Sequence, residues 1–172
     1  MNTDQKPLNY GDQIKLLRII GDKAIDHFNE EVRETNWSHY PGAFSQYDIS
    51  NLFYTSDQLE YDVGSARIRP ESIDVFTNGR LVRFGDLQHK TGRSQLAVLI
   101  DQLRQGAMVR VRDLQNASQS IEHTVRQLEQ LFLAKCQVNL YLAPMGGAGF
   151  PAHFDITDGF VVQCGGTKDW TI

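Results

Sequence analysis

Apolar residues recur at three- and four-residue steps in three stretches of the chain, the spacing that gathers side chains on one face of an α-helix. These stretches are residues 12–34, the segment between Ser94 and Gly106, and the segment that begins at Ser118 or Ser120. Ser94 suits a helix start because its hydroxyl can accept a hydrogen bond from a free backbone N–H, and Gly106 suits a helix end. The pattern predicts three helices packed on the domain, with a partner-binding helix as the alternative for the first.

Shorter segments alternate apolar and polar residues, which is typical of half-buried β-strands. Residues 73–77 and 80–84 flank Asn78-Gly79, a dipeptide that tolerates the positive φ angles of a type I′ turn, so they predict a β-hairpin. The other segments with a strand pattern are 107–111, 136–143, 153–155, 159–163 and 168–172. In the second of these, Val138, Leu140 and Leu142 share one face, while Asn139 and Tyr141 point the opposite way.

Three local signals lie between these elements. Pro41-Gly42 predicts a turn, and Thr55 with Gln58 forms a capping box for a short helix over residues 57–61. His89 lies in a polar segment that we interpret as a loop. Helical patterns come first and strands crowd toward the end, which favours an α+β fold with a β-sandwich or barrel core. We divide the chain into an N-terminal helical segment, 1–36, and a β-rich domain, 37–172.

Composition narrows the functional class. The chain has 172 residues, 41% of them apolar, and a net charge of −4, which suits a globular domain without a broad electrostatic footprint for nucleic acid. Two cysteines outside a CxxC pair predict buried, reduced thiols. The polar N-terminus has no secretory signal, and no run reaches the roughly 18 apolar residues of a membrane span. We therefore expect a cytoplasmic protein with no membrane partner.

The candidate chemistry centres on His153 and Asp155. Residues two apart on a strand point to the same face, so these two would present an imidazole beside a carboxylate, with Phe154 directed into a core. An imidazole and a carboxylate are two of the three ligands of the 2-His-1-carboxylate triad that binds Fe(II). A simple hydrogen-bonded pair is the alternative interpretation.

The flanks of this pair carry a distinctive set of motifs. They are Asn139-x-Tyr141-x-x-Pro144, the glycine-rich loop after it, His153-Phe154-Asp155, Asp158-x-Phe160-x-x-Gln163, Gly166 and Lys168-x-Trp170. With these motifs, the chain from about residue 37 onward resembles the JmjC-type, cupin-like 2-oxoglutarate oxygenases, and most closely their ribosomal-oxygenase branch. The resemblance implies a double-stranded β-helix (jelly-roll, cupin-like) core with the N-terminal helices packed outside.

The resemblance also implies roles for individual residues. His153 and Asp155 match the first two iron ligands, and Lys168 matches the basic residue that pairs with the distal carboxylate of 2-oxoglutarate. Asn139 and Tyr141 match positions that line the cosubstrate pocket, although buried hydrogen bonding is the alternative for both. A solvated surface lysine is the alternative interpretation of Lys168. No catalytic residue beyond the metal ligands is implied.

One departure from the family pattern concerns the third metal ligand. The family has a second histidine several tens of residues after the HxD motif, whereas here the chain ends 17 residues past Asp155. The remaining histidines, His27, His39, His89 and His123, precede the motif in segments that do not match that ligand. We therefore expect a jelly roll that is incomplete at its C-terminal end, either the N-terminal portion of a longer protein or a chain completed by a partner.

The resulting functional expectation is an oxygenase that uses Fe(II) and 2-oxoglutarate. It would hydroxylate a protein, peptide or peptide-like small molecule while 2-oxoglutarate is decarboxylated to succinate. The alternatives are a non-catalytic cupin-like binding module, a fragment inactive without the distal histidine, and a metal-dependent cupin isomerase or dioxygenase that does not use 2-oxoglutarate. A homodimer remains open, and a nucleic-acid partner is not expected.

Overall fold

The structure is a computed structural model that describes residues 30, 32, 36–42, 53–147, 150 and 153–171. The chain divides into two compact units, one made of Met1–Leu52 with Asp155–Ile172 and the other of Phe53–Phe154. Almost all of the helix predicted over residues 12–34 lies outside the described residues, so that prediction and the predicted division at residue 36 remain untested. The turn predicted at Pro41-Gly42 is present, with Gly42 at φ 71°.

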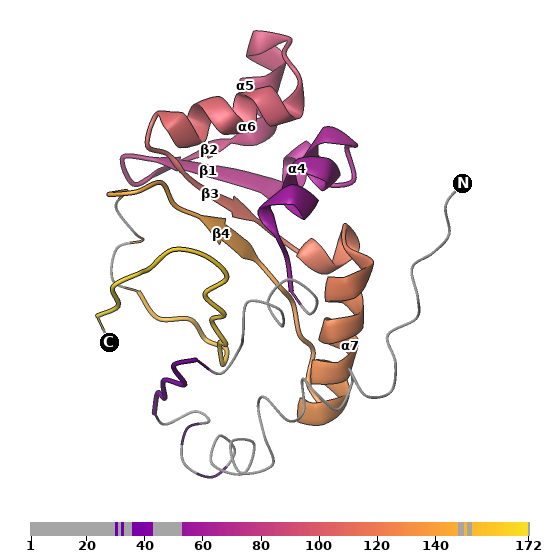
Figure 1. Cartoon of the computed structure of the whole chain (residues 1–172), viewed down its shortest axis with the longest axis vertical. Coiled ribbons are helices and arrows are strands. Elements are labelled where there is room, and N and C mark those ends of the chain that lie inside the picture. Colours follow the sequence, from indigo (N-terminus) through magenta and orange to yellow (C-terminus); the bar gives the residue numbers. More distant parts are fainter. Residues whose placement is uncertain are drawn as a thin grey trace. The chain divides into compact units, whose positions relative to one another are not determined.

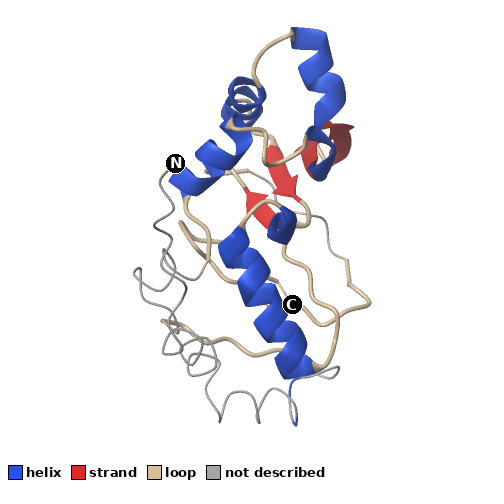
Figure 2. Ribbon diagram, turned by 90° about the vertical axis from the view of Figure 1, so that its right-hand side faces the viewer, coloured by secondary structure: helices blue, strands red, loops and turns tan. Residues whose placement is uncertain are grey.

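The Phe53–Phe154 unit is a mixed helix and sheet structure, which confirms the α+β class. Its elements in chain order are α4 (Ser56–Gly64), η2 (Pro70–Ser72), β1 (Ile73–Thr77), β2 (Arg80–Arg83), α5 (Phe84–Thr91), α6 (Gln95–Arg104), β3 (Met108–Val111), η3 (Leu114–Asn116), α7 (Gln119–Phe132) and β4 (Leu140–Leu142). The strands form one sheet of order β2-β1-β3-β4, antiparallel throughout (Figure 1). Helices α5 and α6 lie beside the strands, whereas α7 lies past the end of β3 (Figure 1 and Figure 2). Among the described residues, no helix is both long enough and apolar enough to cross a membrane.

Local signals in the sequence produce the expected starts and turns. The Thr55 hydroxyl accepts a hydrogen bond from the backbone N–H of Gln58 at 3.2 Å, and the Ser94 hydroxyl accepts one from Ala97 at 3.4 Å. Asn78 and Gly79 adopt φ angles of 51° and 72° in the turn between β1 and β2. The helix start at Thr55, the helix after Ser94 and the hairpin are therefore confirmed, although α4 is longer than predicted.

Helix α5 corrects the interpretation of His89 as a loop residue. His89 lies in the last turn of this helix, which ends where Gly92 takes the left-handed conformation at φ 61°. Phe84, predicted as the last residue of a strand, is instead the first residue of α5 and is completely buried. A short helix with a single buried anchor leaves only a weak periodic pattern in the sequence.

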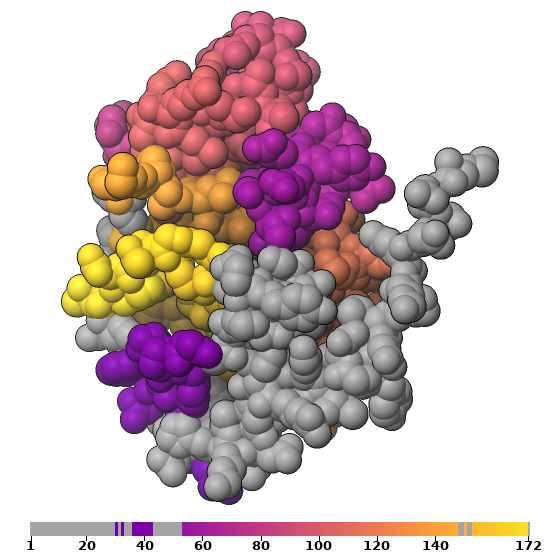
Figure 3. All heavy atoms as spheres, in the orientation of Figure 1, coloured from indigo at the N-terminus to yellow at the C-terminus, as the bar shows by residue number. Residues whose placement is uncertain are grey.

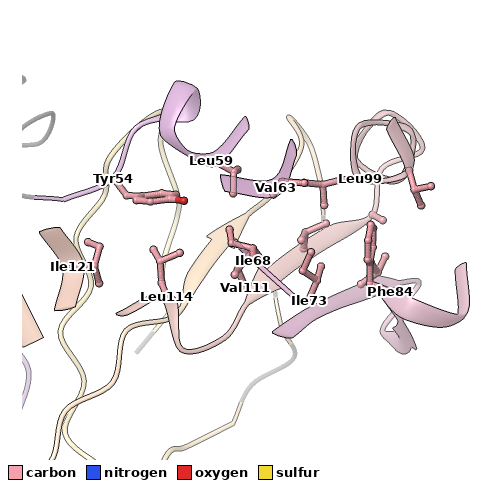
Figure 4. Close-up of a cluster of buried hydrophobic side chains, with 14 of the residues drawn as sticks. Tyr54, Leu59, Val63, Ile68, Ile73, Phe84, Leu99, Val111, Leu114 and Ile121 are labelled. Atoms are coloured by element: carbon pink, nitrogen blue, oxygen red, sulfur yellow. The ribbon is translucent and has the colours of Figure 1, made fainter. Parts of the chain in front are cut away.

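One face of the sheet forms the hydrophobic core. Ile73 and Val75 of β1 lie opposite Val111 and Val109 of β3, and all four are buried against the helices (Figure 4). The cluster also takes in residues from the helices and loops, namely Tyr54, Leu59, Val63, Ile68, Phe84, Val98, Leu99, Ala107, Leu114, Ile121 and Val125. Val138, Leu140 and Leu142 pack against it, as the alternation over residues 136–143 predicted, although the strand is only Leu140–Leu142.

The strands predicted at 153–155, 159–163 and 168–172 are wrong for the described residues. Residues 153–171 contain no strand, and all of them except Val162 and Cys164 are exposed; part of this segment is visible in yellow in Figure 3. Phe154, predicted to enter a core, is 88% exposed, and Ile156 is 96% exposed. A strand requires a hydrogen-bonded neighbour, and no described strand pairs with this segment. Cys164 in this segment and Cys136 are reduced thiols, but both are half-buried rather than buried.

A buried carboxylate ties α4 to the residues on either side of it. Asp62 is fully buried, and its Oδ2 atom accepts hydrogen bonds from the Tyr54 hydroxyl at 2.6 Å and from Gln58 Nε2 at 3.0 Å. Arg67 Nη1 lies 3.6 Å from the other carboxylate oxygen. Burial raises the pKa of the Tyr54 hydroxyl far above its ordinary value, and the hydrogen bond to Asp62 and the negative charge of Asp62 raise it further.

The Asp62 cluster predicts a specific loss of stability. We expect Asp62→Ala to lower the free energy of unfolding by about 1–3 kcal/mol, because the Tyr54 hydroxyl and the Gln58 amide would lose their buried acceptor. Glu60→Ala, at an exposed position of the same helix, should change it by less than about 0.5 kcal/mol. Urea denaturation of both variants tests this, and equal values for the two would contradict it.

The raised pKa of Tyr54 predicts alkaline sensitivity. The folded state holds this hydroxyl protonated, so its contribution to stability is complete below the unfolded pKa of about 10 and declines as the pH rises above it. The free energy of unfolding of the unchanged chain should therefore fall more steeply between about pH 9 and about pH 11 than that of Tyr54→Phe. Parallel slopes for the two proteins would argue against this assignment.

Candidate functional site

The face of the sheet opposite the core carries a row of polar side chains. Strand register places Asp74 of β1 opposite Arg110 of β3, and Arg110 opposite Tyr141 of β4. Arg110 donates to Asp74 Oδ2 from Nε at 3.0 Å and from Nη2 at 2.7 Å, and Arg112 Nε lies 3.0 Å from the same oxygen. Two guanidinium groups thus compensate the charge of a carboxylate that is almost completely buried.

Arg110 connects this row to Tyr141. Burial by itself lowers the pKa of the Arg110 guanidinium, but hydrogen bonding to Asp74 and the charge of Asp74, with smaller contributions from Tyr141, raise it above its ordinary value. The guanidinium also lies over the ring of Phe76, 5.4 Å from the ring centroid. Arg110 is therefore a permanent cation held in one orientation by groups on both neighbouring strands.

Phe150 is the centre of an aromatic cluster on the same unit. Its ring meets those of Phe76, Tyr141 and His153 edge to face, with centroid distances of 4.8, 5.7 and 5.8 Å. Edge-to-face contacts of this kind stabilise a defined ring orientation. Phe150 thereby packs against a predicted metal ligand, His153, and against a predicted cosubstrate-pocket residue, Tyr141.

Asn139 makes a structural contact at the other end of β4. Its Oδ1 atom accepts a hydrogen bond at 3.2 Å from the backbone N–H of Asp113, which adopts the left-handed conformation at φ 54°. Next to it, Leu114 N donates to Val138 O at 2.8 Å. This is the hydrogen-bonding role left open as an alternative for Asn139, and the cosubstrate role of Asn139 and Tyr141 stays a prediction.

The predicted metal ligands and Lys168 lie in the strand-free segment, so the shared strand face on which we based their geometry is absent. His153, Asp155 and Lys168 are all exposed. The donor types fit Fe(II), since an imidazole nitrogen and a carboxylate oxygen are ligands that this metal takes. Across the part of the chain that the structure describes, no three His, Cys, Asp or Glu side chains are grouped to hold a metal. The fit therefore concerns the donor atoms of two residues, His153 and Asp155, and their role as metal ligands stays a prediction.

Sequence reasoning missed four residues of this site, Asp74, Phe76, Arg110 and Phe150. A usable signal existed for Asp74 and Phe76, because strand alternation places both on the face opposite Ile73 and Val75. A charged residue inside an otherwise apolar strand indicates a buried partner. No sequence pattern indicated that the partner would be Arg110, which lies 36 residues away.

Comparison with known proteins finds a family similarity for the C-terminal part of the chain. Residues 113–172 match the JmjC domain. The chain is 27% identical over 164 residues to "Ribosomal oxygenase 1" of Danio rerio, an alignment that covers 91% of this chain and 28% of that protein. It is 28% identical over 130 residues to "Bifunctional lysine-specific demethylase and histidyl-hydroxylase NO66" of Dictyostelium discoideum, covering 73% of this chain and 24% of that protein.

A third relative completes the comparison. The protein of the same name from Branchiostoma floridae is 30% identical over 129 residues, which is 75% of this chain and 19% of that relative. The chain thus spans less than a third of the length of these curated relatives. All five residues predicted for the site fall inside the matched segment 113–172.

The aromatic cluster predicts an effect of Phe150 on His153. Phe150→Ala should shift the His153 ring resonances and weaken Fe(II) binding roughly tenfold, because the imidazole would lose the contact that orients it. Met145→Ala removes a fully exposed side chain of the same loop and should change neither quantity. Anaerobic Fe(II) titration and NMR spectra of the histidine rings provide the measurements. Unchanged ring resonances in Phe150→Ala would contradict the positioning role of Phe150.

Proposed function

We propose that the intact protein is an Fe(II)- and 2-oxoglutarate-dependent oxygenase. Residues 113–172 match the JmjC domain, which confirms the resemblance to JmjC-type cupin-like oxygenases and supports this proposal. The observation that carries the proposal is the His153-Phe154-Asp155 motif inside the matched segment, which also contains Lys168, the residue that the resemblance matches to the partner of 2-oxoglutarate. Relatives named as ribosomal oxygenases and histidyl-hydroxylases support an oxygenase rather than a cupin isomerase.

In this proposal each residue has a separate task. His153 and Asp155 donate a nitrogen and an oxygen to Fe(II), which supplies the oxidising chemistry when it is bound with O2 and 2-oxoglutarate. The ammonium of Lys168 pairs with the distal carboxylate of 2-oxoglutarate as a point charge. Tyr141, held next to Arg110 and Phe150, lines the cosubstrate pocket. Asn139 supports the same strand through its contact with Asp113.

The proposed substrate is a side chain of a protein or peptide. Two relatives are named as enzymes acting on histidyl and lysyl groups, so histidine and lysine side chains are the first to test. A peptide-like small molecule is the alternative substrate. The cytoplasmic location expected from the sequence remains a prediction, and the oligomeric state, including a homodimer, remains open.

A second candidate function is a non-catalytic binding module. The specific observation in its favour is that the described residues contain no group of three metal donors. The two functions differ in a measurable way, because only an oxygenase converts 2-oxoglutarate to succinate.

Succinate formation tests the proposal directly. The longest natural form of the chain, supplied with Fe(II), ascorbate and 2-oxoglutarate, should produce succinate. His153→Ala should reduce the rate by more than the roughly 10–100-fold that follows loss of a group supporting a metal ligand. Lys168→Ala should chiefly raise the KM for 2-oxoglutarate. His89→Ala, on α5, is the matched control and should retain the full rate. Undiminished succinate formation by His153→Ala would refute the metal assignment, and no succinate from the unchanged protein would favour the binding module.

A further inference from the structure

A cavity lined by three arginines lies between the start of β1 and the end of β3. It has a volume of about 250 Å³, and its polar lining consists of Arg67, Arg69, Ser72, Arg112, Asp113 and Asn116. The remaining lining residues are apolar. Along the β1–β3 ladder the cavity is at the end where Ile73 pairs with Val111, whereas the aromatic cluster around Phe150 is at the end where Phe76 pairs with Met108. The cavity therefore lies at the opposite end of this ladder from the aromatic cluster, and two of its lining residues, Arg112 and Asp113, contact Asp74 and Asn139.

Two of the three guanidinium groups are held in place by groups that do not line the cavity. Arg67 stands over the ring of Tyr61 at 5.1 Å and lies 3.6 Å from Asp62 Oδ1. Arg112 Nε lies 3.0 Å from Asp74 Oδ2, and its Nη2 atom donates to the carbonyl of Glu71. Each guanidinium carries five N–H donors, so these contacts occupy only part of its capacity. These contacts restrict both guanidinium groups before any ligand binds, which lowers the entropic cost of binding.

The charges favour a compact oxyanion. The lining contains three cationic groups and one carboxylate, that of Asp113, on a chain whose net charge is −4. The carboxylates of Asp62 and Asp74 offset the charge of Arg67 and Arg112 from outside the lining, so hydrogen-bond geometry rather than long-range attraction must hold an anion. Planar guanidinium groups provide paired donors that match the oxygens of a phosphate group.

The volume indicates more than a single small ion. Since a water molecule takes about 30 Å³ in the liquid, the cavity has room for the equivalent of about eight waters. A phosphate group fits with space for part of the group that it is attached to, and the apolar lining residues suit that attached part. We propose that this cavity binds the phosphate group of a small phosphomonoester, contacted by Arg67, Arg69 and Arg112, with Ser72 and Asn116 as neutral hydrogen-bonding groups.

The test uses the 172-residue chain and two probes, inorganic phosphate and glycerol 3-phosphate. Either probe should produce saturable shifts of the backbone amides of residues 112–117 in ¹H–¹⁵N spectra, and the phosphomonoester should bind more tightly. Sodium acetate and sodium chloride at equal ionic strength should not reproduce them. Arg69 takes part in neither of the two ion pairs behind the cavity, so Arg69→Gln leaves both intact and should weaken binding roughly tenfold or more.

A matched arginine outside the cavity provides the control. Arg104→Gln, in the last turn of α6, removes one exposed positive charge and should bind both probes as the unchanged chain does. Three results would overturn the proposal: no saturable shift with either probe, equal shifts with acetate, or equal weakening by Arg104→Gln and Arg69→Gln. Tighter binding of inorganic phosphate than of glycerol 3-phosphate would support a phosphate site while identifying the free anion as its ligand.

Discussion

The two-residue alternation of side chains along β1 and β3 is the constraint on which the rest of this structure depends. Ile73 and Val75 must pack with Val109 and Val111 against the helices, because this face supplies the centre of the core. The opposite face is then determined as well. A slip of one residue would carry Asp74 and Arg110 into that core and expose the aliphatic side chains. Burial on one side therefore positions the polar groups on the other.

The polar face is stable only as a connected group. A carboxylate as deeply buried as that of Asp74 is unfavourable unless partners compensate its charge, and here two guanidinium groups approach the same oxygen. Arg110 in turn contacts the ring of Phe76 and the side chain of Tyr141. One buried carboxylate thus organises side chains on three strands, and the aromatic cluster extends this order to His153.

The connection after β3 shows how one residue can have both a structural and a functional interpretation. Asp113 has a left-handed backbone conformation that is uncommon for a residue with a side chain. Its backbone N–H donates a hydrogen bond to the Oδ1 atom of Asn139. The Oε1 atom of Gln115 accepts a hydrogen bond from the backbone N–H of Val138 at 3.0 Å. The residues just before β4 are therefore held to this turn by two side-chain contacts. The arginine-lined cavity includes Asp113, which makes the same turn part of its wall.

The sequence by itself determined the elements whose signals are local. Thr55, Ser94 and Asn78-Gly79 act on backbone groups only a few residues away, so the capped helices and the hairpin could be predicted without knowing their surroundings. The motif around His153 and Asp155 also indicated the family. A strand pattern alone did not make residues 153–171 into strands, because a strand forms only with a neighbour to pair with.

Only the tertiary structure decided which distant side chains meet. Asp74 and Arg110 are 36 residues apart, and their contact follows from the pairing register of β1 with β3. Phe150 joins Phe76 and His153 through packing that no spacing in the sequence indicates. Local hydrogen bonds depend on chain neighbours, whereas these contacts depend on burial of the opposite face of the sheet, and that is why the sequence alone could not supply them.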